Sequence, residues 1–291
     1  MSSDLSEIIS AASPDFSKGQ RRIVDYITEH PEEAAYMTAA QLGRVAGVSE
    51  STVVRFALEL GFSGYPEFHR AMQESLQKNL TSVQRVRVSN DRLPDEKLLD
   101  AVLERDIAQI RATLETVDRG AFDAAVDAIV SAGKIYIIGM RSSFALAEFL
   151  EYYLSLIFPN VQLVRNAGGS EIFEQMMNVG EGDTIVAISF PRYSSRIVNA
   201  VDFACRSGAK VVAITDSMSS PIAKPAYAAL CVKSNMASFA DSLVAPLSII
   251  NALIAAISKK KNDEISSALA RLERVWDEYH VYNKKCMGKE L

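Results

Sequence analysis

The chain has 291 residues, of which 48% are hydrophobic and 23% charged, and its formal net charge is −5. This composition supports a buried core and excludes a disordered or fibrous chain, and the acidic balance excludes a uniformly basic nucleic-acid coat but not a local DNA contact. No charged region followed by an apolar run opens the sequence and no stretch reaches about 18 apolar residues, so we expect neither a secretory signal nor a membrane span. The three cysteines are far apart and have no nearby histidine. This predicts a cytoplasmic protein without disulfides or a metal site.

Residues 1–77 are predicted to form a helical domain. The segment 17–30 carries Ile23, Val24 and Ile27 at helical spacing, and Pro31 follows its expected end. Further helices are expected to begin near residues 38, 49 and 65. The stretch 78–97 is polar, rich in arginine and without a clear period, so it is predicted to be a linker to a second domain that covers residues 98–285.

Residues 38–56 have the spacing of a helix-turn-helix. On the first helix Leu42 and Val45 are expected to face inward, and Gly47 can adopt the positive φ of a tight turn. Ser49 is a good N-cap for the second helix. The second helix then has an inward face of apolar residues at helical spacing: Val53, Phe56 and Leu60. An ordinary helical hairpin with a polar outer face would have the same spacing.

The candidate DNA contacts lie on the outer face of the second helix and beside it. A recognition helix meets base edges and phosphates with its N-terminal end and its exposed side. The candidates are Ser49, Ser51, Thr52 and Arg55, together with Arg44 on the preceding helix. Between residues 36 and 90 six Lys/Arg stand against four Asp/Glu, a net charge of +2. Phosphate contacts supply most DNA affinity, so we expect a dimer on a two-fold site to supply what one monomer lacks.

After residue 98, short apolar runs alternate with helical segments. The five expected strands are 134–139, 161–165, 183–190, 209–216 and 227–234. The helical segments fall at about 142–158, 170–178, 194–207 and 238–258, with another at 263–283. Continuously apolar strands that alternate with helices predict a parallel sheet covered on both faces. The expected fold is therefore an all-α helix-turn-helix domain followed by an α/β doubly wound domain with a five-stranded sheet in the flavodoxin-like order 2-1-3-4-5.

Two loops rich in serine and arginine follow the first and third expected strands. The first contains Arg141, Ser142 and Ser143, and the second contains a further set: Ser189, Arg192, Ser194 and Ser195. In the 2-1-3-4-5 order these strands flank the switch point where ligands bind, and backbone N–H groups at helix starts suit an anion. The sequence predicts one anion site there. Plain N-capping by these serines is the alternative.

The sequence also resembles a known family. Residues 48–68, VSESTVVRFALELGFSGYPEF, resemble the DNA-binding domain of RpiR-type bacterial transcription regulators. The two serine-rich loops, with VVAITDS at 211–217 and FADSL at 239–243, resemble the sugar isomerase (SIS) domain of the same family. The chain departs from the family where Gly43 replaces a usual alanine, where Arg141 replaces a glycine, and where Pro191 and Arg192 replace a serine and a glycine.

The resemblance implies a regulator of carbohydrate catabolism genes. Its partners would be a double-stranded DNA operator, a phosphorylated sugar or sugar acid as effector, and further copies of itself in a homodimer or homotetramer. The five loop serines would hold the effector's phosphate: Ser142, Ser143, Ser189, Ser194 and Ser195. The apolar helices 145–158 and 243–257 are candidate dimer surfaces, or else core against the sheet.

Related SIS domains occur in aldose–ketose phosphate isomerases, which is the alternative function. That reaction needs an acid and a base at the sugar, commonly a glutamate with a histidine. The three histidines are His30, His69 and His280, and none lies in the predicted sheet. Four glutamates could still reach the predicted anion site, and His280 could come from a partner subunit, but the simpler interpretation of each is a solvated helix residue: Glu148, Glu151, Glu171 and Glu174. We therefore expect a sensor with no catalytic residue, no cofactor and no metal. A module that mediates only protein contacts is a third hypothesis, against which the recognition-helix residues stand.

Overall fold

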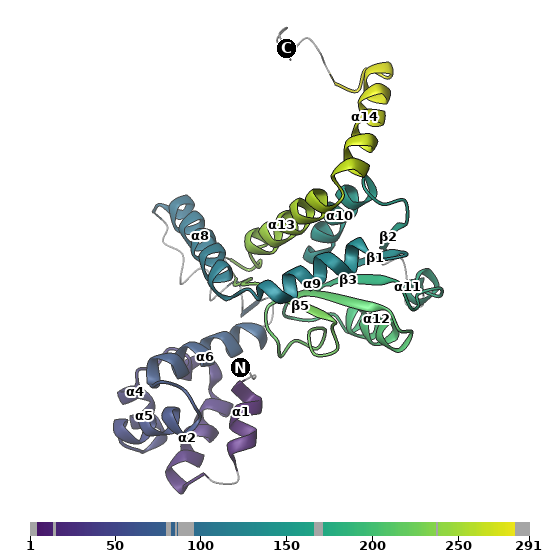
Figure 1. Cartoon of the computed structure of the whole chain (residues 1–291). Coiled ribbons are helices and arrows are strands. Elements are labelled where there is room, and N and C mark those ends of the chain that lie inside the picture. Colours follow the sequence, from purple (N-terminus) through teal and green to yellow (C-terminus); the bar gives the residue numbers. More distant parts are fainter. Residues whose placement is uncertain are drawn as a thin grey trace. The chain divides into compact units, whose positions relative to one another are not determined.

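The computed structural model of the chain describes residues 5–13, 16–79, 83, 84, 86, 96–165, 171–236 and 238–282. The chain divides into two compact units (Figure 1). The helical unit comprises Met1–Arg105 and Asn235–Ser242, and the sheet unit comprises Asp106–Ser234 and Leu243–Leu291. Most of the predicted linker 78–97 lies outside the described residues, so the domain limits 1–77 and 98–285 remain predictions. Within the described part, no helix combines the length and the apolar character needed to cross a membrane.

The helical unit is built from short amphipathic helices around an aromatic core. Its helices include α1 (Leu5–Ala12), α2 (Lys18–Glu29), α3 (Pro31–Ala34), α4 (Ala39–Ala46), α5 (Glu50–Glu59) and α6 (Tyr65–Asn79). Both α2 and α4 begin with a reciprocal capping box, formed by Ser17 with Gln20 and by Thr38 with Gln41. In the core the rings of Phe56 and Phe68 are fully buried and meet edge to face, with their centroids 5.6 Å apart.

The sheet unit confirms the predicted fold class. Its five strands pair in parallel in the order β2-β1-β3-β4-β5. They are β1 (Ile135–Gly139), β2 (Val161–Val164), β3 (Thr184–Ile188), β4 (Lys210–Thr215) and β5 (Ala228–Cys231). Every residue of β1 and β3 is buried, because helices cover both faces of the sheet. This explains why the strands read as continuous apolar runs rather than as alternating ones.

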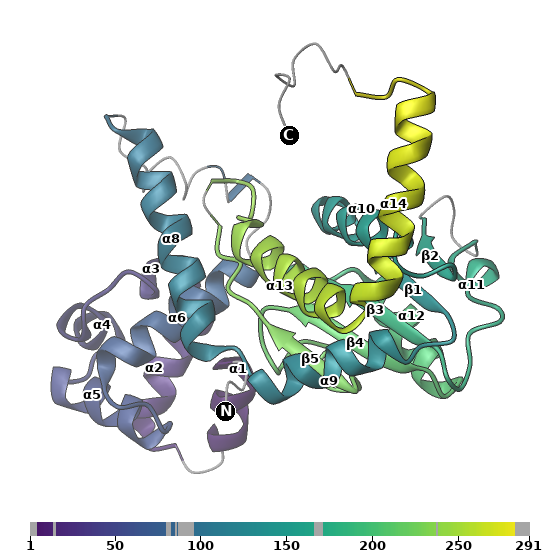
Figure 2. The same ribbon diagram turned by 45° about the horizontal axis from the view of Figure 1, so that its top comes forward.

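Two sets of helices cover the sheet. One hydrophobic cluster contains residues of α9 (Arg119–Val130), α10 (Ser142–Ser155) and α13 (Val244–Lys260). The cluster on the other face contains residues of α11 (Glu171–Gln175) and α12 (Ser195–Arg206) (Figure 2). The helix predicted over 238–258 begins only at Val244, since Met236 and Asp241 form an isolated antiparallel bridge ahead of it.

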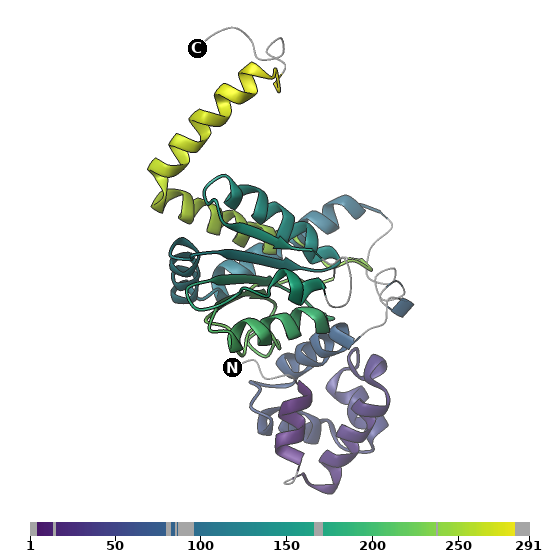
Figure 3. The same ribbon diagram turned by 90° about the vertical axis from the view of Figure 1, so that its right-hand side faces the viewer.

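Two further helices are less covered. The chain enters the sheet unit through α8 (Leu98–Thr116). The last described helix, α14 (Asn262–Glu278), has no buried residue, and Figure 3 shows it leading away from the sheet.

Candidate functional site

The helix-turn-helix forms as the sequence predicts, with one correction. Gly47 ends α4 at φ 67°, in the left-handed region that favours glycine. Leu42 is buried on the inner face of α4, whereas Val45 is 45% exposed and the expectation that it faces inward is wrong. Small Ala46 and Ala39 are buried on that face instead. The turn after α4 lies so close to the helix that position 43 has room only for glycine, since an added Cβ on Gly43 would lie 2.9 Å from the carbonyl oxygen of Val48.

The start of α5 is held by hydroxyl groups. The Thr52 backbone N–H donates to the Ser49 hydroxyl over 3.2 Å, so Ser49 is the predicted N-cap. The Ser49 hydroxyl also lies 2.8 Å from the hydroxyls of Ser51 and Thr52. Inside the helix, Val53 and Phe56 are fully buried. The polar N-terminal end of α5 is thus fixed from within by its apolar residues, and from outside by the three hydroxyls.

Arg55 and Arg44, the two arginines among the predicted DNA contacts, are both exposed. The Arg55 guanidinium Nε lies 3.9 Å from Glu59 Oε1, and both side chains are more than half exposed. Such a surface pair contributes at most about 1 kcal/mol, so Arg55 can leave it for a phosphate or a base. Sequence reasoning missed Arg22 of α2, which donates to the Gly47 carbonyl over 3.4 Å and adds a cation at the turn. The position of Arg22 within α2 was the only available signal for its role at the turn. That position does not show which helix packs against the turn, so the contact could not be predicted.

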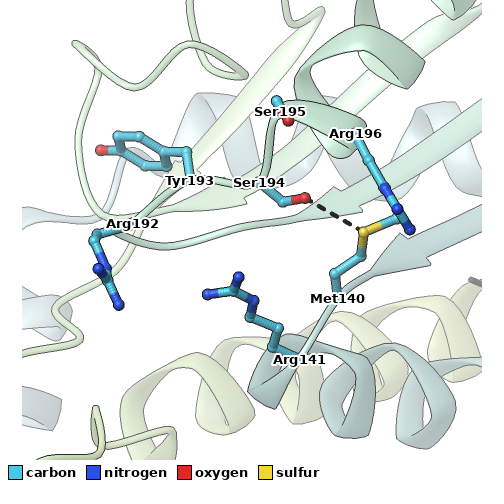
Figure 4. Close-up of a pocket in the computed structure, with 7 residues that line it drawn as sticks. All are labelled: Met140, Arg141, Arg192, Tyr193, Ser194, Ser195 and Arg196. Carbon is cyan, nitrogen blue, oxygen red and sulfur yellow. Dashed lines mark hydrogen bonds between the residues drawn. The ribbon is translucent and has the colours of Figure 1, made fainter. Parts of the chain in front are cut away.

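The second candidate site is a pocket at the carboxyl end of the sheet. The loop after β1 leads into α10 and the loop after β3 leads into α12, and β1 and β3 are neighbours in the sheet. The pocket is about 540 Å³ and is lined by Met140, Arg141, Arg192, Tyr193, Ser194, Ser195 and Arg196. Figure 4 shows Arg141 reaching from the start of α10 toward the loop that carries Arg192. The two predicted loops therefore meet in one pocket.

Four of the seven predicted ligand residues line this pocket, and three do not. Arg141, Arg192, Ser194 and Ser195 are among the lining residues. The others lie elsewhere at the same strand ends: Ser142 is exposed, and Ser143 and Ser189 are buried. The structure adds Met140, whose sulfur accepts a hydrogen bond from the Ser194 hydroxyl over 3.3 Å, and Tyr193 and Arg196. Tyr193 and Arg196 are adjacent in sequence to Ser194 and Ser195, and this adjacency is the signal that could have predicted them as lining residues.

Arg141 has a backbone conformation that side chains disfavour. It precedes α10 with φ 55° and ψ −128°, where glycine is the usual residue. Gly139 just before it also has a structural reason, since an added Cβ would lie 2.4 Å from the Ser143 carbonyl oxygen. The strand and the helix are thus closely apposed at Gly139, and the turn between them places Arg141 in the lining of the pocket.

The second loop is held by a half-buried hydrogen bond. The Tyr193 hydroxyl donates to Asp216 Oδ1, at the end of β4, over 2.6 Å. The Asp216 carboxylate also accepts from the Thr215 hydroxyl over 3.3 Å. Burial, reinforced by the Asp216 charge, raises the pKa of the Tyr193 phenol far above its ordinary value. Tyr193 therefore stays protonated and keeps this loop attached to β4.

The lining of the pocket is strongly cationic. Three of its residues are arginines and none of the lining residues is acidic. The first turn of α12, which starts at Ser195, adds backbone N–H groups without an intrahelical partner and the positive end of the helix dipole. The pocket can therefore bind an anion through guanidinium groups, hydroxyls and backbone N–H groups.

Comparison with known proteins identifies both units. The model of the helix-turn-helix domain of the rpiR family matches residues 3–79, and the model of the SIS domain matches residues 128–256. The sugar isomerase domain of an RpiR transcription factor from Sphaerobacter thermophilus has a similar structure, with a TM-score of 0.59 and 28% identity over 62% of this chain and 99% of that one. The Vibrio vulnificus NanR protein, solved with ManNAc-6P, shares the fold at a TM-score of 0.58 and 20% identity, over 95% of this chain and 99% of NanR.

Two relatives that match in sequence are HexR transcriptional regulators. HexR of Pseudomonas aeruginosa is 25% identical over 278 residues, which cover 93% of this chain and 94% of HexR. HexR of Escherichia coli K12 is 26% identical over 219 residues, 74% of this chain and 72% of HexR. With the helix-turn-helix of α4 and α5 followed by the parallel sheet and its pocket, these matches show that the chain belongs to the rpiR family of transcriptional regulators that carry a C-terminal SIS domain.

Proposed function

We propose that the chain binds a two-fold DNA operator and changes its affinity for that operator when the pocket takes up a phosphorylated sugar or sugar acid. The observation that carries this proposal is the meeting of two arginine- and serine-bearing loops in one cationic pocket of a helix-turn-helix regulator. The family resemblance supports genes of carbohydrate catabolism as targets. A bacterial operator lies in the cytoplasm, which is where we place the protein.

On the DNA side, α5 is the proposed recognition helix. Ser51, Thr52 and Arg55 would contact base edges or phosphates of the DNA. Ser49 would fix the start of the helix, and Arg44 would contact the DNA sugar-phosphate backbone. This assignment is supported by the exposure of Arg55 and by its exposed ion pair with Glu59, which a phosphate or base could replace. A homodimer or homotetramer would present two such helices to the two half-sites.

On the effector side, the charge of the pocket favours two anionic groups on one molecule. A phosphate group carries about −1.5 to −2 charges at neutral pH, and a carboxylate adds one more. Arg141, Arg192 and Arg196 all line the pocket, so guanidinium groups from both loops could contact a phosphate and a carboxylate of one phosphorylated sugar acid. The phosphate would bind at Ser194 and Ser195 at the start of α12, with the arginines clamping both anions. A sugar phosphate, ManNAc-6P, is bound in the related NanR structure, which supports the phosphate half of this assignment.

We further propose that the pocket does not catalyse isomerisation. None of the lining residues is a histidine or a carboxylate, so no side chain in the lining can take the sugar's C2 proton. His30 and His69 belong to the helical unit, and His280 follows α14. The check is proton exchange at C2 of pentose and hexose phosphates followed by NMR. Exchange that depends on the protein would favour the isomerase alternative.

The deciding experiment measures ligand and DNA together. We expect 6-phosphogluconate to raise the melting temperature more than glucose 6-phosphate, gluconate or inorganic phosphate, since a ligand that prefers the folded state stabilises it. The best compound should then change operator affinity in fluorescence anisotropy, because binding at two sites of one protein is coupled. A protein that binds no genomic fragment at low salt would contradict the regulator function. A melting temperature indifferent to every anion in the series would contradict the sensor.

A further inference from the structure

Helix α8 exposes a stripe of large apolar side chains. Leu103, Ile107, Ile110 and Leu114 are 52%, 50%, 36% and 64% exposed. At 100° per residue these four side chains fall within about 60° of one another around the helix, so they form one continuous strip. Figure 2 shows α8 as one uninterrupted helix along this length. Among the described residues, Leu103, Ile107 and Leu114 keep at least half of their surface exposed, and Ile110 about a third.

The buried side of α8 is polar, and a hydrogen bond on that side keeps the helix from rotating to bury its apolar strip. Gln109 and Thr113 are polar and only 4% exposed, so α8 directs polar groups inward and apolar groups outward. The Thr113 hydroxyl accepts a hydrogen bond from the Lys233 backbone N–H over 3.1 Å, beside β5 in the same unit. This bond fixes the rotation of the helix. Because surface helices normally bury their apolar stripe, the exposed strip of α8 requires a partner.

The spacing of the strip points to a second copy of the same helix. The four residues follow one another at intervals of four, three and four, which is the alternation that packs one helix against another in a coiled coil. Placed antiparallel about a two-fold axis, Ile107 meets the partner's Ile110 and Leu103 meets the partner's Leu114. The strip is complementary to itself in this register, as an interface between identical chains must be.

The charges beside the strip agree with the same register. Glu104 and Arg111 are both exposed and lie on the same flank of the helix. In the antiparallel pair Glu104 is offset from the partner's Arg111 by two residues, about 3 Å along the axis, so opposite charges meet twice across the two-fold. We propose that α8 is a self-association helix of this protein, which pairs antiparallel with α8 of a second copy through Leu103, Ile107, Ile110 and Leu114.

This inference assigns a surface to the oligomer that operator binding is proposed to require. The role of this pairing in operator binding rests on the proposed function. The pairing itself does not, because the strip, its spacing and its charges are independent of DNA and effector. The predicted apolar helices α10 and α13 stay available for other contacts, although most of their apolar residues pack against the sheet.

The test is the self-association of the full chain without DNA or effector. We expect Ile107→Glu combined with Ile110→Glu to raise the dissociation constant about 100-fold or more in sedimentation equilibrium, since two charges are placed in the contact centre. The matched control is Ala108→Glu, an exposed site on another side of α8, which should leave the constant unchanged. Circular dichroism checks that each variant is folded. A folded double variant that associates like the wild type, or a wild type that is monomeric at micromolar concentration, would overturn the proposal.

A second set of variants tests the register without disturbing the apolar strip. Glu104→Arg alone and Arg111→Glu alone should each weaken association about twofold to fivefold, and the two together should restore it. Failure of the combined variant to recover would overturn the antiparallel register. A protein that dimerises through α8 but responds to neither DNA nor 6-phosphogluconate would contradict the proposed function and leave this inference standing.

Discussion

Replacing Arg141 with glycine should stabilise the protein slightly and weaken its binding of the effector. At φ 55° and ψ −128° a residue with a Cβ is strained by about 1–2 kcal/mol, which glycine relieves. Glycine also makes the unfolded chain more flexible, at a cost of about 0.5–1 kcal/mol. The net gain of about 0.5–1 kcal/mol corresponds to a rise of about 1–4 °C in the melting temperature for a unit of this size.

The same substitution removes one guanidinium from the pocket. A hydrogen bond to a charged group contributes about 1.5–3 kcal/mol, so affinity for a phosphorylated sugar acid should fall about 10- to 100-fold. Scanning calorimetry measures the change in melting temperature, and titration calorimetry with 6-phosphogluconate measures the change in effector affinity.

The matched control is Arg141→Ala. It removes the same charge but keeps a Cβ at positive φ, so it should lose the same affinity without gaining stability. If the glycine variant is no more stable than the alanine variant, the backbone of Arg141 is not strained. If both variants bind 6-phosphogluconate like the wild type, Arg141 is not an effector contact, and the anion is held elsewhere.

Three further substitutions test the rest of the site. Arg55→Ala should reduce specific operator affinity by about 1–3 kcal/mol in fluorescence anisotropy; an equal loss on random duplex would show a phosphate contact instead. Gly43→Ala should gain about 1 kcal/mol of helix propensity but lose more, because the added Cβ meets the Val48 carbonyl oxygen at 2.9 Å; a higher melting temperature would show that the turn at Val48 can move away from α4 freely. Tyr193→Phe removes the 2.6 Å hydrogen bond to Asp216 and should weaken effector binding severalfold while ligand-free operator binding stays unchanged; unaltered effector affinity would show that the loop needs no attachment to β4.

Local sequence determined most of the secondary structure, and the alternation of strands with helices indicated the fold type from which the order of the sheet was predicted. Buried parallel strands must be apolar along their whole length, so the five strands could be predicted within a few residues. The positive φ at Gly47 and the cap at Ser49 depend on neighbours one to three residues away, which is why they too could be predicted. The switch point between β1 and β3 followed from strand order alone, and it predicted where the two loops would meet.

Tertiary structure decided which side of each element is covered. Periodicity places Val45 on the same strip as Leu42, but packing of α4 against its neighbours buries Leu42 and leaves Val45 exposed. The loop serines are equivalent in sequence, yet Ser194 and Ser195 line the pocket while Ser143 is buried beside it. In α8 the polar face is the buried one, because the Thr113 hydroxyl bonds the backbone next to β5. An amphipathic pattern shows that a helix has two faces, but only the neighbouring elements determine which of them meets solvent.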